Sequence, residues 1–396
     1  MLRDMAEHGE NVPAYRTIRV AGPEGPVEAV ADAAAWQARM AYPDILSAGG
    51  PLFGVVRERE EGGWELITPF SGTAPQDARD SMGSQFRMLA KRCEEDGDTD
   101  ALQECLRAAE RTEWETDDEV TLLGTRYRVA RAECFLRSGP DGPEPPRPTD
   151  PDPMEPGESH RAPDPSTGFV FDPVIATGMS AGILKAELLS LVPKPGTVPG
   201  AMREDALTAA LTHPGGVLLP AAFMTAEKIH GHWRPSSVPH HTTPQSARDT
   251  LAMALRVKIP WKRGLGPRER APYSATADRL DAERCDELTV EGSHFRVVRV
   301  ERLVRIGPEG PEGPRPADLD PQPPVMVQHQ QDVASGLIPA DGTPDGEDAG
   351  PVELDPSTQR LAALVGEEEA RRKRLRTEGP PAGRSPESGE SGADGS

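Results

Sequence analysis

Cysteine, aromatic residues and lysine are all scarce in this chain of 396 residues. Its 4 cysteines have no paired CxxC spacing, which argues against a zinc ribbon and against a disulfide framework. Aromatic residues make up only 4%, against 43 prolines and 39 glycines, so a good share of the chain is unsuited to a packed interior. We therefore expect ordered modules with reduced thiols, joined by long Pro/Gly-rich loops.

Long hydrophobic runs are missing as well. Residues 1–10 have no apolar core of a signal peptide, and the most apolar later stretch, 178–192, is interrupted by Lys185 and Glu187. We expect no signal peptide, no membrane span and a cytoplasmic location. The net charge of -21 repels phosphate backbones and anionic membranes at long range, so neither nucleic acid nor a membrane is an expected partner.

An internal similarity is the clearest feature of the sequence. Residues 118–153 match residues 286–321 without a gap, at an offset of 168 residues. Upstream, TAPQDARDSM at 73–82 matches TTPQSARDTL at 242–251. The sequence therefore predicts two diverged tandem copies of one module, each within the usual size of a domain.

These matches divide the chain into five parts. We predict, in chain order, an N-terminal extension (1–14), copy one (15–153), a linker with a helix near 180–191 (154–198), copy two (199–324), and a loop-rich tail (325–396). The tail should contain one helix near 356–376 and a disordered end. Because that helix is only moderately amphipathic, we expect it to dock weakly.

Each copy has the same predicted elements: a short helix, a β-hairpin, a longer helix and a closing hairpin. In copy one the hairpins turn at Gly62 and at Gly124. The longer helix opens with a capping box, at 73–76 in copy one and at 242–245 in copy two, where Pro260 should end it. The predicted fold class is therefore α+β, a small helix/β-hairpin module present twice, with a partly disordered C-terminus.

One face of the longer helix should belong to the core, because Ala78, Met82, Phe86 and Leu89 recur at helical spacing. A further helix is predicted at 100–111 in copy one, and its counterpart near 275–284 has a weaker pattern. A Gly-Pro tract follows each closing strand and predicts an extended, polyproline-like arm.

Charged residues present in both copies are the candidates for ligand binding or acid–base chemistry. They could bind an anion, and they are Arg79, Asp80, Arg131 and Glu133 in copy one and Arg248, Asp249, Arg299 and Glu301 in copy two. Further shared arginines are Arg128, Arg137, Arg296 and Arg305. Arg131 and Glu133 are two apart on a strand, so they project from one face and can pair with each other or with Asp80. This structural interpretation is favoured, and no residue is assigned as catalytic.

Histidines gather in copy two alone, at His230, His232, His240 and His241. Four imidazoles close together could hold zinc or nickel. The matching positions in copy one have no histidine, and no cysteine or carboxylate completes the set nearby. We therefore interpret the histidines as turn residues and expect neither a metal nor a cofactor.

Common catalytic motifs are missing from the sequence. GxSxG, a P-loop, HExxH and a GxGxxG that opens a helix after a strand all fail to occur. A basic run at 371–374 follows three glutamates by four residues, so the helix should neutralise its own charges along a solvated face.

The combination of TxPQxARDS, GxxFRVVRxE and the tract GPEGPEGPRPADLDP resembles a family of unknown function from high-GC Gram-positive bacteria, over residues 15–321. The resemblance implies a bacterial intracellular setting and transfers no catalytic residue. Our leading hypothesis is a non-enzymatic binding or scaffold protein with an unknown protein or small-molecule partner. The alternative is an enzyme or small-anion sensor that uses the shared Arg, Asp and Glu residues, and a cleft lined by them would distinguish the two.

Overall fold

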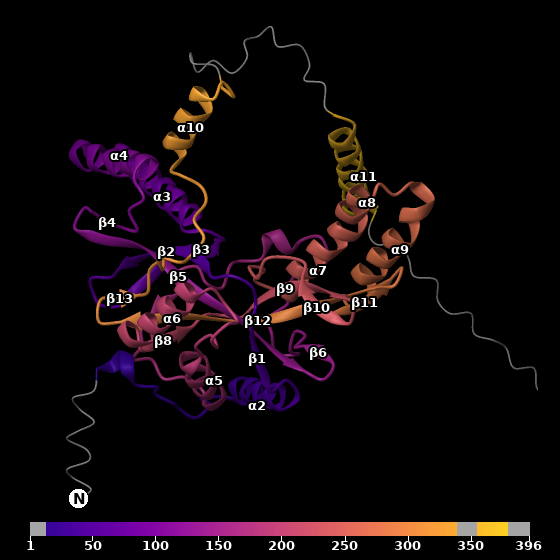
Figure 1. Cartoon of the computed structure of the whole chain (residues 1–396), viewed down its shortest axis with the longest axis horizontal. Coiled ribbons are helices and arrows are strands. Elements are labelled where there is room, and N and C mark those ends of the chain that lie inside the picture. Colours follow the sequence, from indigo (N-terminus) through magenta and orange to yellow (C-terminus); the bar gives the residue numbers. More distant parts are fainter. Residues whose placement is uncertain (1–12, 339–354, 379–396) are drawn as a thin grey trace, which may run out of the picture.

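A computed structural model describes residues 13–338 and 355–378. This part of the chain forms an α+β fold, in which one large antiparallel sheet has helices on both faces (Figure 1). The first half (15–153) and the second half (199–324) have the same order of helices and strands.

Each half begins with a helix and ends with a long strand and a short return strand. The first half contains α2 (Pro26–Ala41), β1 (Asp44–Ser47), β2 (Leu52–Glu58), β3 (Trp64–Gly72), α3 (Pro75–Asp96), α4 (Thr99–Trp114), β4 (Glu119–Leu122), β5 (Thr125–Gly139) and β6 (Gly142–Pro143). The second half contains α6 (Gly200–Thr212), β8 (Gly215–Leu218), β9 (Ala222–Ile229), β10 (His232–Pro235), α7 (Pro244–Met253), the π-turn η3 (Ala254–Lys258), α8 (Ile259–Arg263), α9 (Pro267–Glu283), β11 (Glu287–Val290), β12 (Ser293–Gly307) and β13 (Gly310–Pro311). Between the halves lie η2 (Ser159–Arg161), β7 (Val170–Phe171) and α5 (Met179–Ser190).

The two longest strands, β5 and β12, pair antiparallel at the centre of the sheet, whose main path is β10-β9-β12-β5-β2-β3-β7. In their register Glu133 lies opposite Leu303, and Glu301 lies opposite Phe135. The same 168-residue offset relates Glu133 to Glu301 and Phe135 to Leu303. The pairing is therefore symmetric about Cys134, and each half contributes the same stretch of strand.

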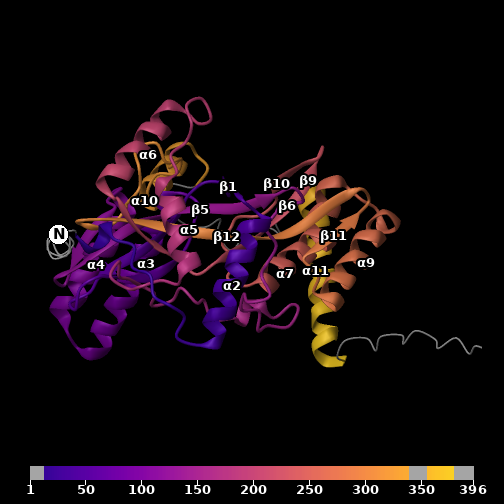
Figure 2. The same cartoon turned by 90° about the horizontal axis from the view of Figure 1, so that it is seen from below.

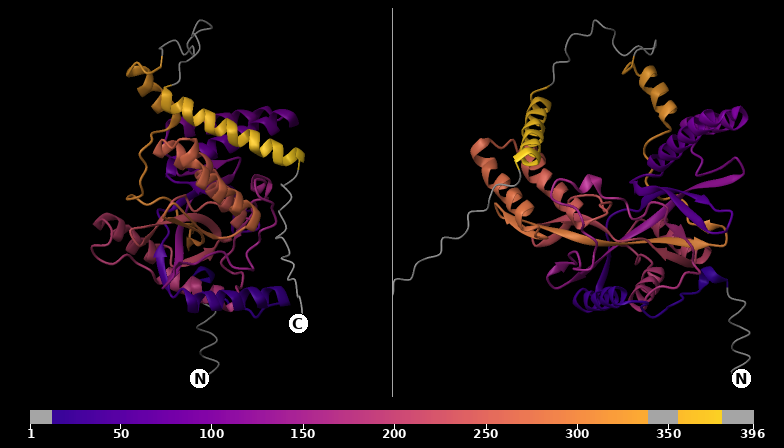
Figure 3. Two further views of the ribbon diagram at one scale, coloured as in Figure 1. Left: turned by 90° about the vertical axis from the view of Figure 1, so that its right-hand side faces the viewer. Right: turned by 180° about the vertical axis from the view of Figure 1, so that it is seen from behind.

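Helices cover the two faces unequally. Helices α3 and α4 lie over the first half of one face, and α7 and α9 lie over the second half of that face (Figures 1 and 3). Helices α2 and α5 lie on the opposite face, and the view from below places them in front of the middle of the sheet (Figure 2). Helices α2 and α5 are therefore separated by the sheet from the helix pairs α3–α4 and α7–α9.

The largest buried cluster draws on both halves, with Val56 and Leu66 from the first and Met224 and Val298 from the second. Since apolar burial is the main favourable term in folding, the halves are stabilised by one common core. A second cluster lies beneath α3 and α4 and includes Phe86, which confirms the predicted stripe; Leu89 is only partly buried. A third lies beneath α7 and α9.

The predicted capping boxes at 73–76 and 242–245 are wrong by one residue. Each helix starts at the proline inside the box, because proline suits the first helical turn, where its missing N–H needs no partner. Thr243 then caps α7 by accepting the N–H of Ser246 (3.1 Å), and the Asp77 carboxylate accepts backbone N–H groups at the start of α3.

Pro260 does not end its helix as predicted. The π-turn η3 shifts the hydrogen-bond register just before it, so Pro260 falls in the first turn of α8 and the chain stays helical as far as Arg263. The weak helix expected near 275–284 is also longer than predicted, because α9 begins at Pro267 and buries Tyr273 and Leu280.

Two helices follow the second half where the sequence predicted one. They are α10 (Val325–Ala334), which packs on α4, and α11 (Pro356–Glu378), which packs on η3 and α8. Leu364 and Glu368 of α11 are buried, and the weak docking expected of this helix stays a prediction. The predicted disordered end lies outside the described residues. Within the described ranges, no helix is long and apolar enough to cross a membrane.

Candidate functional site

The charged candidates occupy corresponding elements in the two halves. Arg79 and Asp80 lie near the start of α3, with Arg131 and Glu133 on β5. Their counterparts lie near the start of α7 and on β12. The tracts that follow the long strands, 140–153 and 308–321, are named the first and second tail segments, and they supply partners to the arginines and glutamates among these candidates.

Arg79 is held by acids from both halves, and its side chain is only 6% exposed. Its Nε donates to Asp118 (2.9 Å), and its Nη1 donates to Asp320 (2.6 Å) in the second tail segment. Asp320 also accepts the backbone N–H of Gln76 (3.1 Å). The tail segment of the second half thus closes over the start of α3 in the first half.

Arg248 makes the reciprocal contacts. Its Nη2 donates to Asp286 (2.7 Å), and its Nη1 donates to Asp152 (2.6 Å) in the first tail segment. Asp152 accepts the backbone N–H of Gln245 (2.8 Å). The same set of contacts therefore occurs twice, with the roles of the halves exchanged.

The strand arginines bind the opposite tail segments as well. Arg131 donates through Nε to Asp318 (2.9 Å), and its backbone N–H donates to the carbonyl of Glu312 (2.9 Å). Arg299 donates to Asp150 (3.0 Å) and makes the corresponding backbone contact. The Gly-Pro tracts, predicted as extended arms, each begin with a short return strand and then lie against the other half.

A tryptophan and a turn glycine fasten each tail segment. Trp64 packs on Gly310 of the second tail segment, and Trp233 packs on Gly142 of the first. Both glycines have positive φ (+105° and +111°), and a Cβ at either would collide with the indole. Arg128 stacks on Trp64 with 4.8 Å from guanidinium carbon to ring centroid, and the corresponding arginine stacks on Trp233 at the same distance.

Arginines keep two strand glutamates ionised: Glu301, which is buried, and Glu133, whose side chain is 18% exposed. Burial alone would raise the pKa of Glu133, but Arg315 and Arg131 among others hold it below its ordinary value. The pKa of Glu301 is lowered against its burial in the same way, chiefly by Arg299. The predicted pairing of Arg131 with Glu133 is confirmed (3.2 Å). Such acids are poor proton donors at neutral pH, since a general acid needs a pKa near the working pH.

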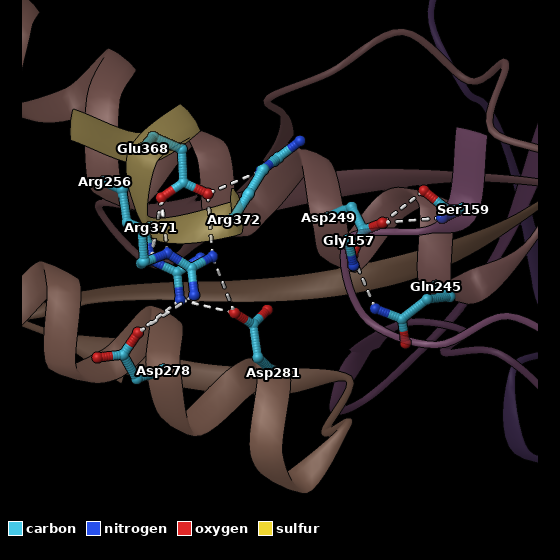
Figure 4. A network of polar contacts seen from close by, with 10 residues as sticks. All are labelled: Gly157, Ser159, Gln245, Asp249, Arg256, Asp278, Asp281, Glu368, Arg371 and Arg372. Atoms are coloured by element: carbon cyan, nitrogen blue, oxygen red, sulfur yellow. Dashed lines mark hydrogen bonds and ion pairs between the residues drawn. The ribbon is translucent and has the colours of Figure 1, made fainter. Parts of the chain in front are cut away.

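Asp80 and Asp249 have different surroundings, although they occupy matching positions. Asp80 is exposed and accepts a hydrogen bond from the side chain of Gln76 (2.8 Å). Asp249 is half-buried and additionally accepts from the N–H of Gly157 (2.9 Å) and from Ser159, both in the linker (Figure 4). Neither aspartate has the role of a partner to the strand arginines that the sequence suggested for Asp80.

A further charged cluster lies where α11 docks, and it was not identified from the sequence. Arg256 in η3 donates through Nη2 to both Asp278 and Asp281 of α9, at 2.7 Å each (Figure 4). Glu368 of α11 lies at this cluster and accepts from Arg372 (2.9 Å), an i,i+4 pair that the sequence predicted. No sequence pattern predicts this cluster, because its members come from segments far apart in the chain.

The two histidine pairs have different environments. His230 and His232 are exposed at the turn between β9 and β10. The rings of His240 and His241 stack with centroids 4.5 Å apart, and Nδ1 of His241 lies 3.1 Å from the hydroxyl of Ser246. Burial, helped by the neighbouring His240, lowers the pKa of His241 to about 4. No group of three or more metal-binding side chains is arranged to hold an ion within residues 13–338 and 355–378, and the metal-free expectation stays a prediction.

A pocket of about 560 Å³ opens between α2, α5 and the loop that joins β8 to β9. Of the charged candidates, Arg299 and Glu301 line it, together with Arg137. Arg39 and Asp32 of α2 line it as well, and sequence reasoning missed both, because α2 and α5 contain no motif and their approach depends on tertiary packing.

The described chain is thus an α+β protein whose halves exchange tail segments across one antiparallel sheet and which has a charged pocket beside α5. A comparison with protein families matches residues 25–321 to the Family of unknown function (DUF5954), and the chain belongs to this family. Comparisons with curated proteins and with solved structures gave no match.

Proposed function

We propose that the two halves are diverged copies of one module that pair within a single chain. Three observations support this: the common order of elements, the symmetric register of β5 and β12, and the reciprocal contacts of the tail segments. A symmetric dimer of single modules with exchanged ends would have this arrangement after fusion of its two chains. In this proposal the domain boundaries are those of the halves, 15–153 and 199–324.

We further propose that the chain is a non-enzymatic binding protein, in which the paired modules form a rigid frame for a small-molecule pocket. The observation that carries this proposal is that the shared arginines and glutamates already form ion pairs with the tail segment of the opposite half. Arg79 and Arg248 each bind two aspartates, and Glu133 and Glu301 are held ionised by arginines. These residues stabilise the pairing of the halves, and the lowered pKa of Glu133 and of Glu301 makes both glutamates unsuited as general acids.

A ligand would then bind where the halves differ. Helix α5 lies in the linker and forms one wall of the pocket, whereas the described helix that follows the second half, α10, packs on α4. The pocket volume of about 560 Å³ lies within the range of small-molecule sites.

We place this activity in the bacterial cytoplasm. The cysteines Cys93, Cys105, Cys134 and Cys285 are all free thiols, which fits a reducing compartment. The net charge of -21 favours solubility and disfavours nucleic acid and membranes as partners. An enzyme or small-anion sensor that uses the shared residues is the second candidate, and its one support is that Arg299 and Glu301 reach the pocket.

Ligand-observed NMR on the full chain tests the proposal with a mixture of small carboxylates, amines, amino acids and phosphate esters. Saturation transfer reports binding, and one-dimensional spectra recorded over hours report any product. We expect bound ligands without product, and loss of binding in Ala35→Phe, which fills the pocket. Ala33→Phe on the exposed side of the same helix is the control. New product signals would favour the enzyme, and binding that survives Ala35→Phe would contradict this pocket.

A further inference from the structure

The pocket beside α5 has a charged floor, an acidic rim and apolar walls. Arg137 of β5 belongs to the floor, whereas Glu24, Glu28 and Asp32 line the side formed by α2 and the residues before it. Apolar residues from α5, the end of β8 and the β8–β9 loop complete the lining, and they include Leu184, Leu218, Leu219 and Pro220. Each of these parts restricts the chemistry of the molecule that fits.

Arg137 has an unused hydrogen-bond donor. Its side chain is 4% exposed, and its Nη2 donates to Glu187 (2.8 Å). Nη1 is buried and has no hydrogen-bond partner in the described part of the chain. A buried donor without a partner is destabilising, because it has lost its hydrogen bonds to water without replacement. An acceptor atom on a ligand that reaches the floor would supply the missing partner.

The counterpart of Arg137 in the second half is satisfied by the protein. Arg305, 168 residues later, donates through Nη2 to the carbonyl of Leu189 (3.1 Å) and through Nε to Glu133 (3.3 Å). Helix α5 therefore supplies a carbonyl acceptor to Arg305 of the second half. Arg137 of the first half instead lines the pocket beside the same helix. The unpaired donor is therefore a feature of one half and is not imposed by the shared module.

The floor has no excess positive charge for a multiply charged anion. Four acids balance the four arginines there: Glu187 binds Arg39 and Arg137, and Glu301 binds Arg147 and Arg299. Glu144 also binds Arg147, and Asp150 also binds Arg299. A phosphate would bring two negative charges to arginines that already have acidic partners. A single carboxylate needs only the one open donor, and a charge-assisted hydrogen bond to guanidinium is about twice as strong as a neutral one.

The rim favours a cation. Asp32 accepts the backbone N–H of Ser180 (2.8 Å) and Glu28 accepts the backbone N–H of Glu24 (2.7 Å), but none of the three acids forms an ion pair in the described chain. Each keeps a carboxylate oxygen for a further donor, since a carboxylate has about four acceptor sites. An ammonium group at the rim would be bound by charges that the protein itself leaves uncompensated.

We propose that this pocket binds a small zwitterion, an amino acid or a molecule like it, with its carboxylate on Arg137, its ammonium group at the acidic rim of α2 and its apolar body between α5 and the β8–β9 loop. This proposal rests on the binding function proposed above and adds the chemical class of the ligand.

Isothermal titration calorimetry on the full chain tests the ligand class with matched probes. The probes are leucine, norleucine and 6-aminohexanoic acid, each compared with the amine that lacks the carboxyl group and with the acid that lacks the amine. We expect at least one zwitterion to bind at least tenfold more tightly than both of its truncated analogues. Zwitterions that bind no better than those analogues, or do not bind, overturn the proposal.

Two variants and a matched control locate the groups. Arg137→Lys keeps the charge opposite Glu187 but removes Nη1, and it should weaken zwitterion and acid binding tenfold or more. Arg305→Lys makes the same change at the counterpart and should leave affinity unchanged. Glu28→Gln on the exposed rim keeps an acceptor for Glu24 and should weaken the zwitterion and the amine but not the acid. Equal effects of the two arginine variants, or no effect of Glu28→Gln, contradict the assignment.

The two levels of the proposal fail in different ways. If Arg137→Lys does not fold, Glu28→Gln still gives the decision, because its side chain is exposed. If ligands of another class bind and Ala35→Phe abolishes their binding, the zwitterion is wrong and the binding function stands. If product forms in the NMR experiment, the binding function itself is wrong.

Discussion

Replacing Asp320 by Asn weakens the exchanged tail segment at one defined point. The Asp320 carboxylate accepts from Arg79 (2.6 Å) and from the N–H of Gln76 (3.1 Å), and its side chain is 25% exposed. Hydrogen bonds to charged groups contribute about 1.5–3 kcal/mol each, and the asparagine oxygen can keep one of the two. Because Arg79 retains Asp118, no charge is left unpaired, and we expect the free energy of unfolding to fall by about 1.5–3 kcal/mol.

The reciprocal position gives an internal check. Asp152→Asn should cost at least as much, since Asp152 makes the same two contacts from the first tail segment and also accepts from Arg284 (3.2 Å). Asp80→Asn is the control, and its exposed side chain predicts a change within about 0.5 kcal/mol. Urea unfolding followed by tryptophan fluorescence measures all three variants. Losses below about 0.5 kcal/mol at both tail positions would refute the argument that the tail segments bind the halves together.

Three further predictions concern the core, the C-terminal helix and pH. Phe86→Ala should cost about 3–5 kcal/mol in urea unfolding, because the ring is fully buried and meets Tyr127 edge-on at 5.1 Å. Deleting residues 339–396 should lower the free energy of unfolding measurably, because it uncovers Arg256 and removes the buried Leu364. The loss should exceed that of the weak docking expected from the sequence and stay below that of Phe86→Ala. The pKa of His241 is about 4 in the folded chain against an ordinary 6.5, so the unfolded chain binds the proton at a higher pH. The free energy of unfolding should therefore fall as the pH drops from about 6.5 to about 4. His241→Asn should reduce this pH dependence.

Local patterns predicted much of the fold because they depend on neighbours in sequence. The helical spacing of Ala78, Met82 and Phe86 identified the buried face of α3, and glycines located the hairpin turns. The end of a helix was less predictable. Pro260 lies within a helix because a π-turn changes the hydrogen-bond register before it, and no residue pattern in the sequence announces that change.

The site depended on contacts between segments far apart in the chain. The sequence showed that Arg79 and Arg248 correspond, but their partners Asp320 and Asp152 lie in the opposite half. Both acids lie in the internally similar stretches 118–153 and 286–321, but this similarity does not indicate that each tail segment binds the opposite half. The pocket was also hidden, because the approach of α5 to α2 is set by tertiary packing.

Cleavage of the linker tests the exchange of tail segments most directly. A protease site inserted in the exposed, proline-rich stretch 192–198 would separate the two halves covalently without touching the tail segments or the β5–β12 pairing. We predict that the cleaved halves coelute in size-exclusion chromatography under native conditions, and separate only in denaturant. Halves that elute apart in native buffer would contradict the account of two modules joined by one sheet, one core and exchanged tail segments.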